Sequence, residues 1–177
     1  MSEQHDPLAE FRATVKAQRT PLPRPPETDD LVVREKDLVW YVPADNPTRL
    51  APVLGTAIKS FELFRQDFEP GGSSDMQRHH HEAVHYVLSG SGYSEIGDKR
   101  YPWAAGDFIS VPPMMWHRHY NGSETEPARM LIVENSKLLE ALGLNYRTSV
   151  GLKTWADIAD QAGRAGRTGQ TGKADGQ

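Results

Sequence analysis

Short apolar or alternating stretches recur about every ten residues along the middle of the chain, from residue 32 to residue 133. Gly, Pro, Asn and Asp separate these stretches, and no helix-length apolar period interrupts them. This spacing is typical of an all-β sandwich or barrel. We therefore predict an all-β domain with strands at residues 38–42, 60–68, 79–88, 92–96, 108–111, 116–120 and 129–134.

The N-terminal end carries a helix signal followed by a proline-rich stretch. Asp6 and Pro7 precede apolar residues spaced three and four positions apart, which predicts a short amphipathic helix. Four prolines between residues 20 and 30 favour an extended connector after it. We assign residues 1–30 to an N-terminal helix and a Pro-rich arm.

Two further helix signals follow the β-rich region. Residues 136–143 lie between a serine and a glycine that suit the two ends of a helix, and a capping-box pattern opens at Thr154. Residues 163–177 contain no large apolar side chain, so burial cannot offset the entropy of ordering them. We predict a barrel over residues 31–135, a helical extension over 136–162 and a disordered tail over 163–177.

Composition narrows the chemistry. A chain of 177 residues suits one domain with tails, and it contains no cysteine. Disulfides, thiolate nucleophiles and sulfur-ligated metal sites are therefore excluded. The net charge of −4 comes without any basic block, so nucleic acid is not an expected partner. With no long apolar run and no charged-then-apolar leader, we expect a cytoplasmic protein without a membrane partner.

Six of the seven histidines fall between residues 79 and 119. Alternate residues of a strand share a face, so His79, His81 and, without a bulge, His85 project to one side. His117 and His119 likewise share a face. The run at 79–81 alone is equally consistent with a solvated edge or an adventitious metal tract. Two clusters on adjacent strands favour a divalent metal, because neutral imidazole is its commonest protein ligand.

The two clusters also fit two known motifs in the right order. The first motif runs glycine, a His-x-His pair, a glutamate and a glycine, and the second runs glycine, proline, histidine and asparagine. The matching residues are Gly71, Gly72, His79, His81, Gly92, Gly106, Pro112, His117 and Asn121. Over roughly residues 60 to 134 the chain resembles the cupins, small barrels that hold one metal ion. The resemblance implies a single cupin β-barrel, a double-stranded β-helix or jelly roll, with short peripheral helices and disordered tails.

Two positions depart from these motifs. Met114 replaces a glycine, and His85 stands where the glutamate is usual. The predicted metal ligands are His79, His81, His85 and His117. Four neutral ligands leave the charge of the ion unscreened, which favours an anionic substrate. Alternatively, His85 only lines the cavity and the other three histidines form a facial site, or a bulge brings Glu82 into the site.

His119 lies about 7 Å along its strand from His117, so we predict a catalytic or substrate-contacting role for it. The pattern at 116–121 resembles that of gentisate-type ring-cleaving dioxygenases. This resemblance implies Fe(II), with Mn(II), Ni(II) and Zn(II) as alternatives, and a small anionic aromatic substrate that reacts with O2. We predict that Arg65 and Met114 contact that substrate.

Other functions remain open at this stage, because the same fold supports several chemistries. The metal could serve as a Lewis acid in a lyase or isomerase, or the chain could be a non-enzymatic binder of small ligands. A further expectation concerns assembly. Several bulky residues alternate with the histidines along the strands and are therefore expected to point outward: Arg78, Tyr86, Trp116, Arg118 and Tyr120. So many bulky side chains on the outside of a monomer are unusual, and we predict a homodimer that covers them.

Overall fold

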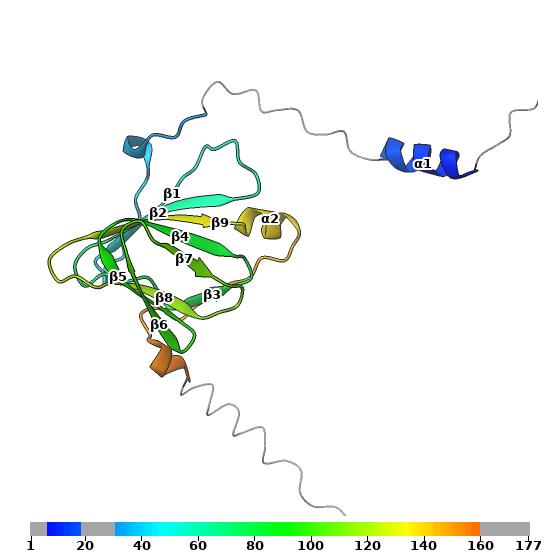
Figure 1. The fold of residues 1–177 in the computed structure, drawn as a ribbon. Coiled ribbons are helices and arrows are strands. Elements are labelled where there is room, and N and C mark those ends of the chain that lie inside the picture. The colour runs from blue at the N-terminus through cyan, green and yellow to red at the C-terminus, as the bar shows by residue number, and fades with distance from the viewer. Residues whose placement is uncertain (1–6, 19–30, 160–177) are drawn as a thin grey trace, which may run out of the picture.

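The computed structural model describes residues 7–18 and 31–159 (Figure 1). Its helices are α1 (Pro7–Gln18), the 3-10 turn η1 (Glu35–Asp37) and α2 (Ser136–Ala141). Its strands are β1 (Thr48–Pro52), β2 (Glu62–Phe68), β3 (Gln77–His79), β4 (Ala83–Ser89), β5 (Ser91–Ile96), β6 (Lys99–Ala104), β7 (Phe108–Val111), β8 (His117–Asn121), β9 (Ala128–Glu134) and β10 (Arg147–Ser149). The predictions for the Pro-rich arm and for residues 163–177 concern residues outside the described ranges.

The described strands form two antiparallel sheets of five strands each, which appear as two layers in Figure 1. One sheet has the order β1-β2-β9-β4-β7 and the other has the order β10-β3-β8-β5-β6. The chain crosses repeatedly between the sheets, as in a jelly roll. The all-β prediction is confirmed. One detail differs, because hydrogen bonds do not close the described strands into one continuous barrel.

The errors in the strand prediction lie mostly at sheet edges. The sequence did not predict β1, β6 or β10, and each of these lies at the edge of its sheet. Edge strands tolerate proline and exposed polar residues, as Pro102 within β6 illustrates, so their pattern is weak. The strand predicted at 38–42 is wrong: within it only Tyr41 makes a bridge, to Leu50, and the apolar side chains there are largely exposed.

The strand predicted at 79–88 is interrupted. Bends at residues 80 and 81 divide it into β3, which belongs to one sheet, and β4, which belongs to the other. His79 ends β3, and His85 lies in the middle of β4. The interruption carries the chain from one layer to the other, so histidines close in sequence reach the interior from two sides.

The interior between the sheets has an apolar part and a histidine-rich part. The apolar cluster consists of Phe68, Ala83, Val87, Ile96, Trp103, Ile109, Val111, Ala128 and Met130. Gly92 permits close packing there, since a Cβ on it would lie 2.0 Å from the Tyr120 carbonyl oxygen and 2.6 Å from the Trp103 ring. The buried apolar surface stabilises the two-layer frame and leaves the remaining interior free for polar side chains.

The predicted helices are present in the described ranges. α1 begins at Pro7 as expected, and α2 begins at Ser136, although Asn135 rather than the serine occupies the cap position. Residues 155–159 are helical, and the Thr154 hydroxyl and Asp157 carboxylate form the predicted capping pair at 2.8 Å. None of the helices described has the length and apolar character needed to cross a bilayer.

The C-terminal segment packs against the outer face of the sheet that contains β8. Arg118 is 7% exposed and donates hydrogen bonds to the carbonyl oxygens of Leu152 and Lys153. Tyr120 donates its hydroxyl hydrogen to Glu95, whose carboxylate also accepts from the backbone N–H of Trp155. The chain itself therefore covers part of the outward surface on which we based the homodimer, which stays a prediction.

Candidate functional site

Five of the six histidines in the described ranges have buried side chains that meet between the two sheets. His79, His81, His85, His117 and His119 are each at most 3% exposed. The ring centroids of His79 and His117 lie 4.7 Å apart, those of His85 and His119 lie 4.2 Å apart, and those of His117 and His119 lie 5.6 Å apart. The structure therefore brings both predicted clusters together.

His80 behaves differently, as its place between two inward histidines predicts. Its side chain is exposed, and its Nδ1 donates to the carbonyl oxygen of Leu144 at 2.8 Å. Its backbone N–H donates to the carbonyl oxygen of Tyr146. His80 therefore anchors the segment that leads into β10 and lies outside the interior cluster.

Three of the buried rings share one arrangement of hydrogen bonds. Nδ1 of His79 lies 2.7 Å from the carbonyl oxygen of His81. Nδ1 of His117 lies 2.9 Å from the carbonyl oxygen of Met115. Nδ1 of His81 lies 3.1 Å from the side-chain oxygen of Asn145. An oxygen of this kind only accepts, so each Nδ1 carries the hydrogen. In the neutral ring, Nε2 then keeps the lone pair that binds a metal ion.

His119 has the opposite arrangement. Its Nδ1 lies 2.7 Å from the Ser94 hydroxyl, which accepts a hydrogen bond from the Trp103 indole N–H at 3.0 Å. With that bond accepted, the hydroxyl hydrogen is available for the Nδ1 of His119. The neutral ring therefore carries its own hydrogen on Nε2. This buried Nε2–H has no partner among the described residues and is a donor facing the interior.

Burial keeps four of the rings, those of His79, His85, His117 and His119, neutral. Loss of solvation, with repulsion from His81 next, lowers the pKa of His79 to about 4. Loss of solvation, followed by the charges of His117 and His79, lowers the pKa of His85 to about 3. Burial also places the pKa of His117 and of His119 well below the ordinary value. At neutral pH these rings are therefore uncharged and able to act as ligands or as neutral hydrogen-bonding groups.

The donor set fits a divalent ion, although the rings do not yet converge. Within the described ranges, no group of three His, Asp or Glu side chains could hold a metal ion as it stands. One reason is visible in His79 and His81, whose rings stack at 3.6 Å with an 8° angle between planes. Yet Nδ1 of His85 and Nε2 of His117 are buried without a partner in the described part of the chain. Unpaired buried nitrogens are costly, so the cluster favours a ligand.

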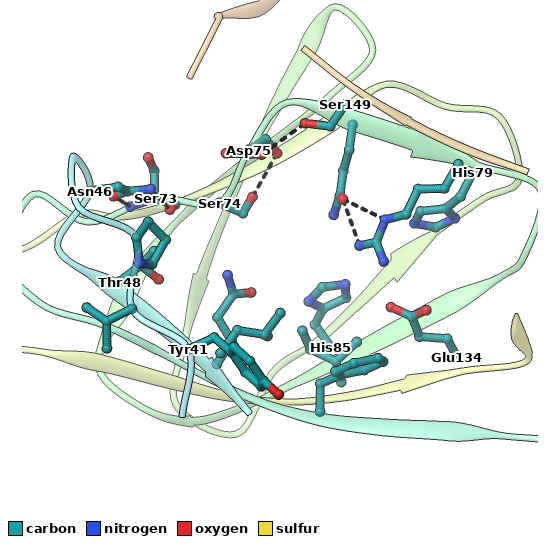
Figure 2. Close-up of a pocket in the computed structure, with 18 residues that line it drawn as sticks. Tyr41, Asn46, Thr48, Ser73, Ser74, Asp75, His79, His85, Glu134 and Ser149 are labelled. Carbon is teal, nitrogen blue, oxygen red and sulfur yellow. Dashed lines mark hydrogen bonds between the residues drawn. The ribbon is translucent and has the colours of Figure 1, made fainter. Parts of the chain in front are cut away.

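A cavity of about 590 Å³ opens beside the cluster (Figure 2). His79 reaches it from one sheet, and His85 and Glu134 reach it from the other. Arg147 lies at its wall and is held by the side-chain oxygen of Gln77, at 3.0 and 2.7 Å. The cavity therefore combines neutral imidazoles, a buried carboxylate and a guanidinium, and its size suits a small organic molecule.

Three residues named from the sequence belong neither to the cluster of buried histidines nor to the lining of this cavity. Arg65 is on the outer face of β2, where it contacts Glu35 at 3.3 Å and Asp67 at 3.4 Å. Met114 lies in the turn before β8, and neither it nor Arg65 is among the described residues that line the cavity. Glu82 is exposed despite the interruption between β3 and β4, so that interruption does not bring its carboxylate into the site.

The fold and the paired histidine clusters agree with a comparison to known families. Residues 64–134 match the family model of the cupin domain. These residues are a cupin domain. Both histidine clusters lie within it, as does the whole set of predicted metal ligands.

The relatives of the cupin domain include enzymes named as dioxygenases. The chain is 29% identical over 99 residues to 5-aminosalicylate 1,2-dioxygenase from Comamonas sp.. It is 33% identical over 101 residues to 1-hydroxy-2-naphthoate 1,2-dioxygenase from Nocardioides sp. (strain KP7). These alignments cover 56% and 57% of this chain but 25% of each relative. The chain thus matches about a quarter of the length of these curated relatives.

Solved structures show the same fold. Salicylate 1,2-dioxygenase from Pseudoaminobacter salicylatoxidans, in adducts with gentisate, superposes with a TM-score of 0.55 at 14% identity, over 63% of this chain and 31% of that one. An RmlC-like cupin from Shewanella frigidimarina gives 0.51 at 15% identity, over 60% and 90%. At these identities the likeness concerns the cupin fold alone.

Sequence reasoning missed three charged residues of the cavity, one of which is Asp75, an exposed residue that accepts a hydrogen bond from Ser149. Glu134 is the last residue of the cupin domain and is 5% exposed, yet in the sequence it reads as the polar end of a strand. Arg147 lies beyond the cupin domain, on β10, and pairs with His79 in the β10–β3 ladder. The sequence did contain one signal for Glu134: a charged residue ends the series of alternate, inward-facing positions on β9. Nothing in the local sequence around Arg147 marks it as a cavity residue.

Proposed function

We propose that the chain binds one divalent metal ion, iron(II) as first choice, and catalyses the oxygen-dependent cleavage of a small anionic aromatic compound. The substrate class is gentisate-like or salicylate-like. The named dioxygenases among the relatives of the cupin domain support this reaction class. The buried, inward-facing histidines support the requirement for a metal.

One observation carries the proposal: the histidines divide into two groups by their hydrogen-bond partners. His79, His81 and His117 give the Nδ1 hydrogen to an oxygen, which leaves Nε2 free to bind the metal ion. His85 joins them as the fourth proposed ligand, and its buried Nδ1 has no partner among the described residues. Hydrogen bonds that fix the orientation and tautomer of metal-ligating histidines are a general feature of such sites.

The residues around this set would handle the substrate. His119 presents an N–H to the interior and would donate a hydrogen bond to a substrate oxygen. Arg147 is bonded to a neutral amide in Gln77, so its charge remains available for an anion. A guanidinium binds a carboxylate through two parallel hydrogen bonds, which fixes both the position and the orientation of the substrate.

Iron(II), when bound, supplies a redox-active centre through which an aromatic diol or enol can pass electrons to O2. The protein has three tasks around it: to hold the aromatic ring within the cavity, to orient its carboxylate and to keep bulk water out. The apolar side chains of Phe64 and Ile132 line the same cavity and suit an aromatic face.

Oxygen uptake by the iron-loaded chain tests the proposal. The full chain would be purified, its metal measured by elemental analysis, and O2 consumption followed with gentisate, salicylate and catechol derivatives. We expect uptake that depends on iron and on an anionic aromatic substrate. A protein that carries zinc and consumes no oxygen with any of these compounds would contradict it. Turnover with Zn(II) or Mn(II) in the absence of O2 would favour a lyase or isomerase instead.

A further inference from the structure

The first motif of this chain lacks its glutamate, yet the interior still contains a carboxylate. Glu134 lies at the end of β9 and is 5% exposed. Its Oε2 atom is buried and has no hydrogen-bond partner within the described ranges. A buried carboxylate oxygen without a partner is costly, so this atom is a candidate for binding a cation.

A histidine nitrogen lies close to that oxygen. Nε2 of His81 lies 2.8 Å from Oε2 of Glu134, but the two are not aligned as a hydrogen bond. In the neutral ring, Nδ1 of His81 donates to Asn145, so Nε2 is an acceptor. Two acceptors this close repel each other unless a proton or a metal cation lies between them. Ligands at about 2.1 Å from one ion and at right angles to each other are about 3 Å apart, which matches this contact.

β4, the strand next to β9, leaves room for the Glu134 carboxylate to bind a cation. Glu134 pairs across the sheet with Ala83, and its neighbour on the same face of β9, Ile132, pairs with His85. The carboxylate therefore lies one inward-facing position from the histidine that replaces the usual glutamate, opposite the small side chain of alanine. A carboxylate lost from one strand can be replaced from the adjacent strand at nearly the same place.

We infer that Glu134 is an oxygen ligand of the metal ion beside His79, His81 and His117, and that it takes the fourth position in place of His85. This inference rests on the proposed metal site. The ligand set is then three neutral nitrogens and one anionic oxygen, which suits Fe(II), Mn(II), Co(II) or Zn(II). The bound ion carries a net charge of about +1 rather than the +2 that an all-histidine set leaves. Glu134 thereby also reduces repulsion between the ion and the guanidinium of Arg147, which lines the same cavity.

Metal titration of the full chain tests this ligand. The chelator-treated protein, its Glu134→Gln variant and the control Glu82→Gln would be titrated with Co(II), with visible absorption and calorimetry as readouts. Glu82 is exposed and accepts a weak hydrogen bond from Asn135 at 3.3 Å, so its variant removes a nearby charge outside the site. We expect Glu134→Gln to weaken Co(II) binding at least about 100-fold and to change the absorption spectrum at saturation, while Glu82→Gln matches the wild type.

Two other results separate the possible failures. If the wild type binds Co(II) and Glu134→Gln binds it within tenfold, or gives the same spectrum at saturation, Glu134 is not a ligand and the proposed function survives. If the wild type binds neither Co(II), Fe(II), Mn(II) nor Zn(II), the proposed function fails and this inference fails with it. Circular dichroism checks folding of the variant. Should Glu134→Gln not fold, Glu134→Asp keeps the oxygen ligand at a shorter reach and must still bind Co(II) with a shifted spectrum.

Discussion

Ser94 and His119 lie opposite each other in the β5–β8 ladder, and the serine hydroxyl is 2.7 Å from Nδ1 of the histidine. Both side chains are fully buried. The indole N–H of Trp103 also donates to this hydroxyl, which leaves the serine to donate to the histidine. A chain of three residues thus determines which nitrogen of His119 carries the hydrogen and is left without a partner in the buried cluster. The apolar core and the candidate site are coupled through this contact.

The first prediction concerns that coupling. Ser94→Ala removes the donor, so the His119 ring can place its hydrogen on either nitrogen and loses its fixed orientation. We expect metal content to be unchanged and turnover to fall about 10-fold to 100-fold. Nitrogen-15 NMR of labelled histidine reports the tautomer directly. Ser110→Ala, at an exposed position of β7, serves as the control. Loss of metal in the Ser94 variant would place His119 among the ligands instead.

The second prediction separates the ligands from His119. His79→Ala, His81→Ala and His117→Ala should each abolish metal retention after desalting, because each removes a proposed ligand nitrogen. His119→Ala should retain the metal and lose turnover, since its Nε2 carries hydrogen rather than a lone pair. His80→Ala is the matched control, because its exposed ring is bonded to Leu144 outside the site. Elemental analysis of the five proteins decides, and equal retention in all of them would mean that the site lies elsewhere.

The sequence predicted that the two groups of histidines meet in the interior, but it did not predict the charged residues around them. Alternation along β8 places His117 and His119 on one face, and that pattern depends only on local geometry. Arg147 reaches the cavity from a three-residue edge strand, and its hydrogen-bond partner Gln77 is 70 positions away in the chain. Such a contact depends on how distant segments pack, which no local period records. The same holds for Glu134, whose partners in the sheet come from β2 and β4.

The third prediction tests Arg147 as the contact for a substrate anion. Arg147→Gln removes the guanidinium while keeping a polar side chain beside Gln77. We expect binding of salicylate to the metal-loaded protein to weaken about 10-fold to 100-fold, the usual effect of losing a charged hydrogen-bonded pair. Binding of the neutral analogue salicylamide should change little. Arg100→Gln, at a side chain that is 67% exposed, is the control. Equal losses for the acid and the amide would contradict a role in recognising charge.

The fourth prediction concerns stability and pH in the metal-free protein. The pKa values of His79 and His85 are about 4 and about 3 in the fold, below the value of about 6.5 in the unfolded chain. As the pH falls below about 6.5, the unfolded chain takes up protons that the folded protein does not, so the free energy of unfolding decreases. Each such histidine contributes up to about 1.4 kcal/mol per pH unit.

Urea unfolding between pH 7.5 and 5, with a chelator present, measures this effect. His85→Gln cannot be protonated and should reduce the slope by about 1.4 kcal/mol per pH unit, the contribution of one group. Changes between pH 7 and 8 should be small, because the histidines are then neutral in both states. A free energy of unfolding that stays constant or rises as the pH falls from 6.5 to 5 would show that the rings are protonated in the fold.

The last prediction follows from Met114, which has a φ of 61°. This left-handed conformation costs a residue with a side chain about 1–2 kcal/mol but is open to glycine, the residue usual at this place in the second motif. The backbone N–H of Met114 donates to the His79 carbonyl oxygen at 2.7 Å, so the turn holds the end of β3 in place. Met114→Gly keeps that hydrogen bond and should raise the free energy of unfolding by about 0.5–1 kcal/mol. Met115→Gly, at a similarly exposed neighbour without a positive φ, should lower it by about the same amount in urea unfolding. Equal destabilisation by both changes would show that the Met114 side chain contributes packing that outweighs its backbone strain.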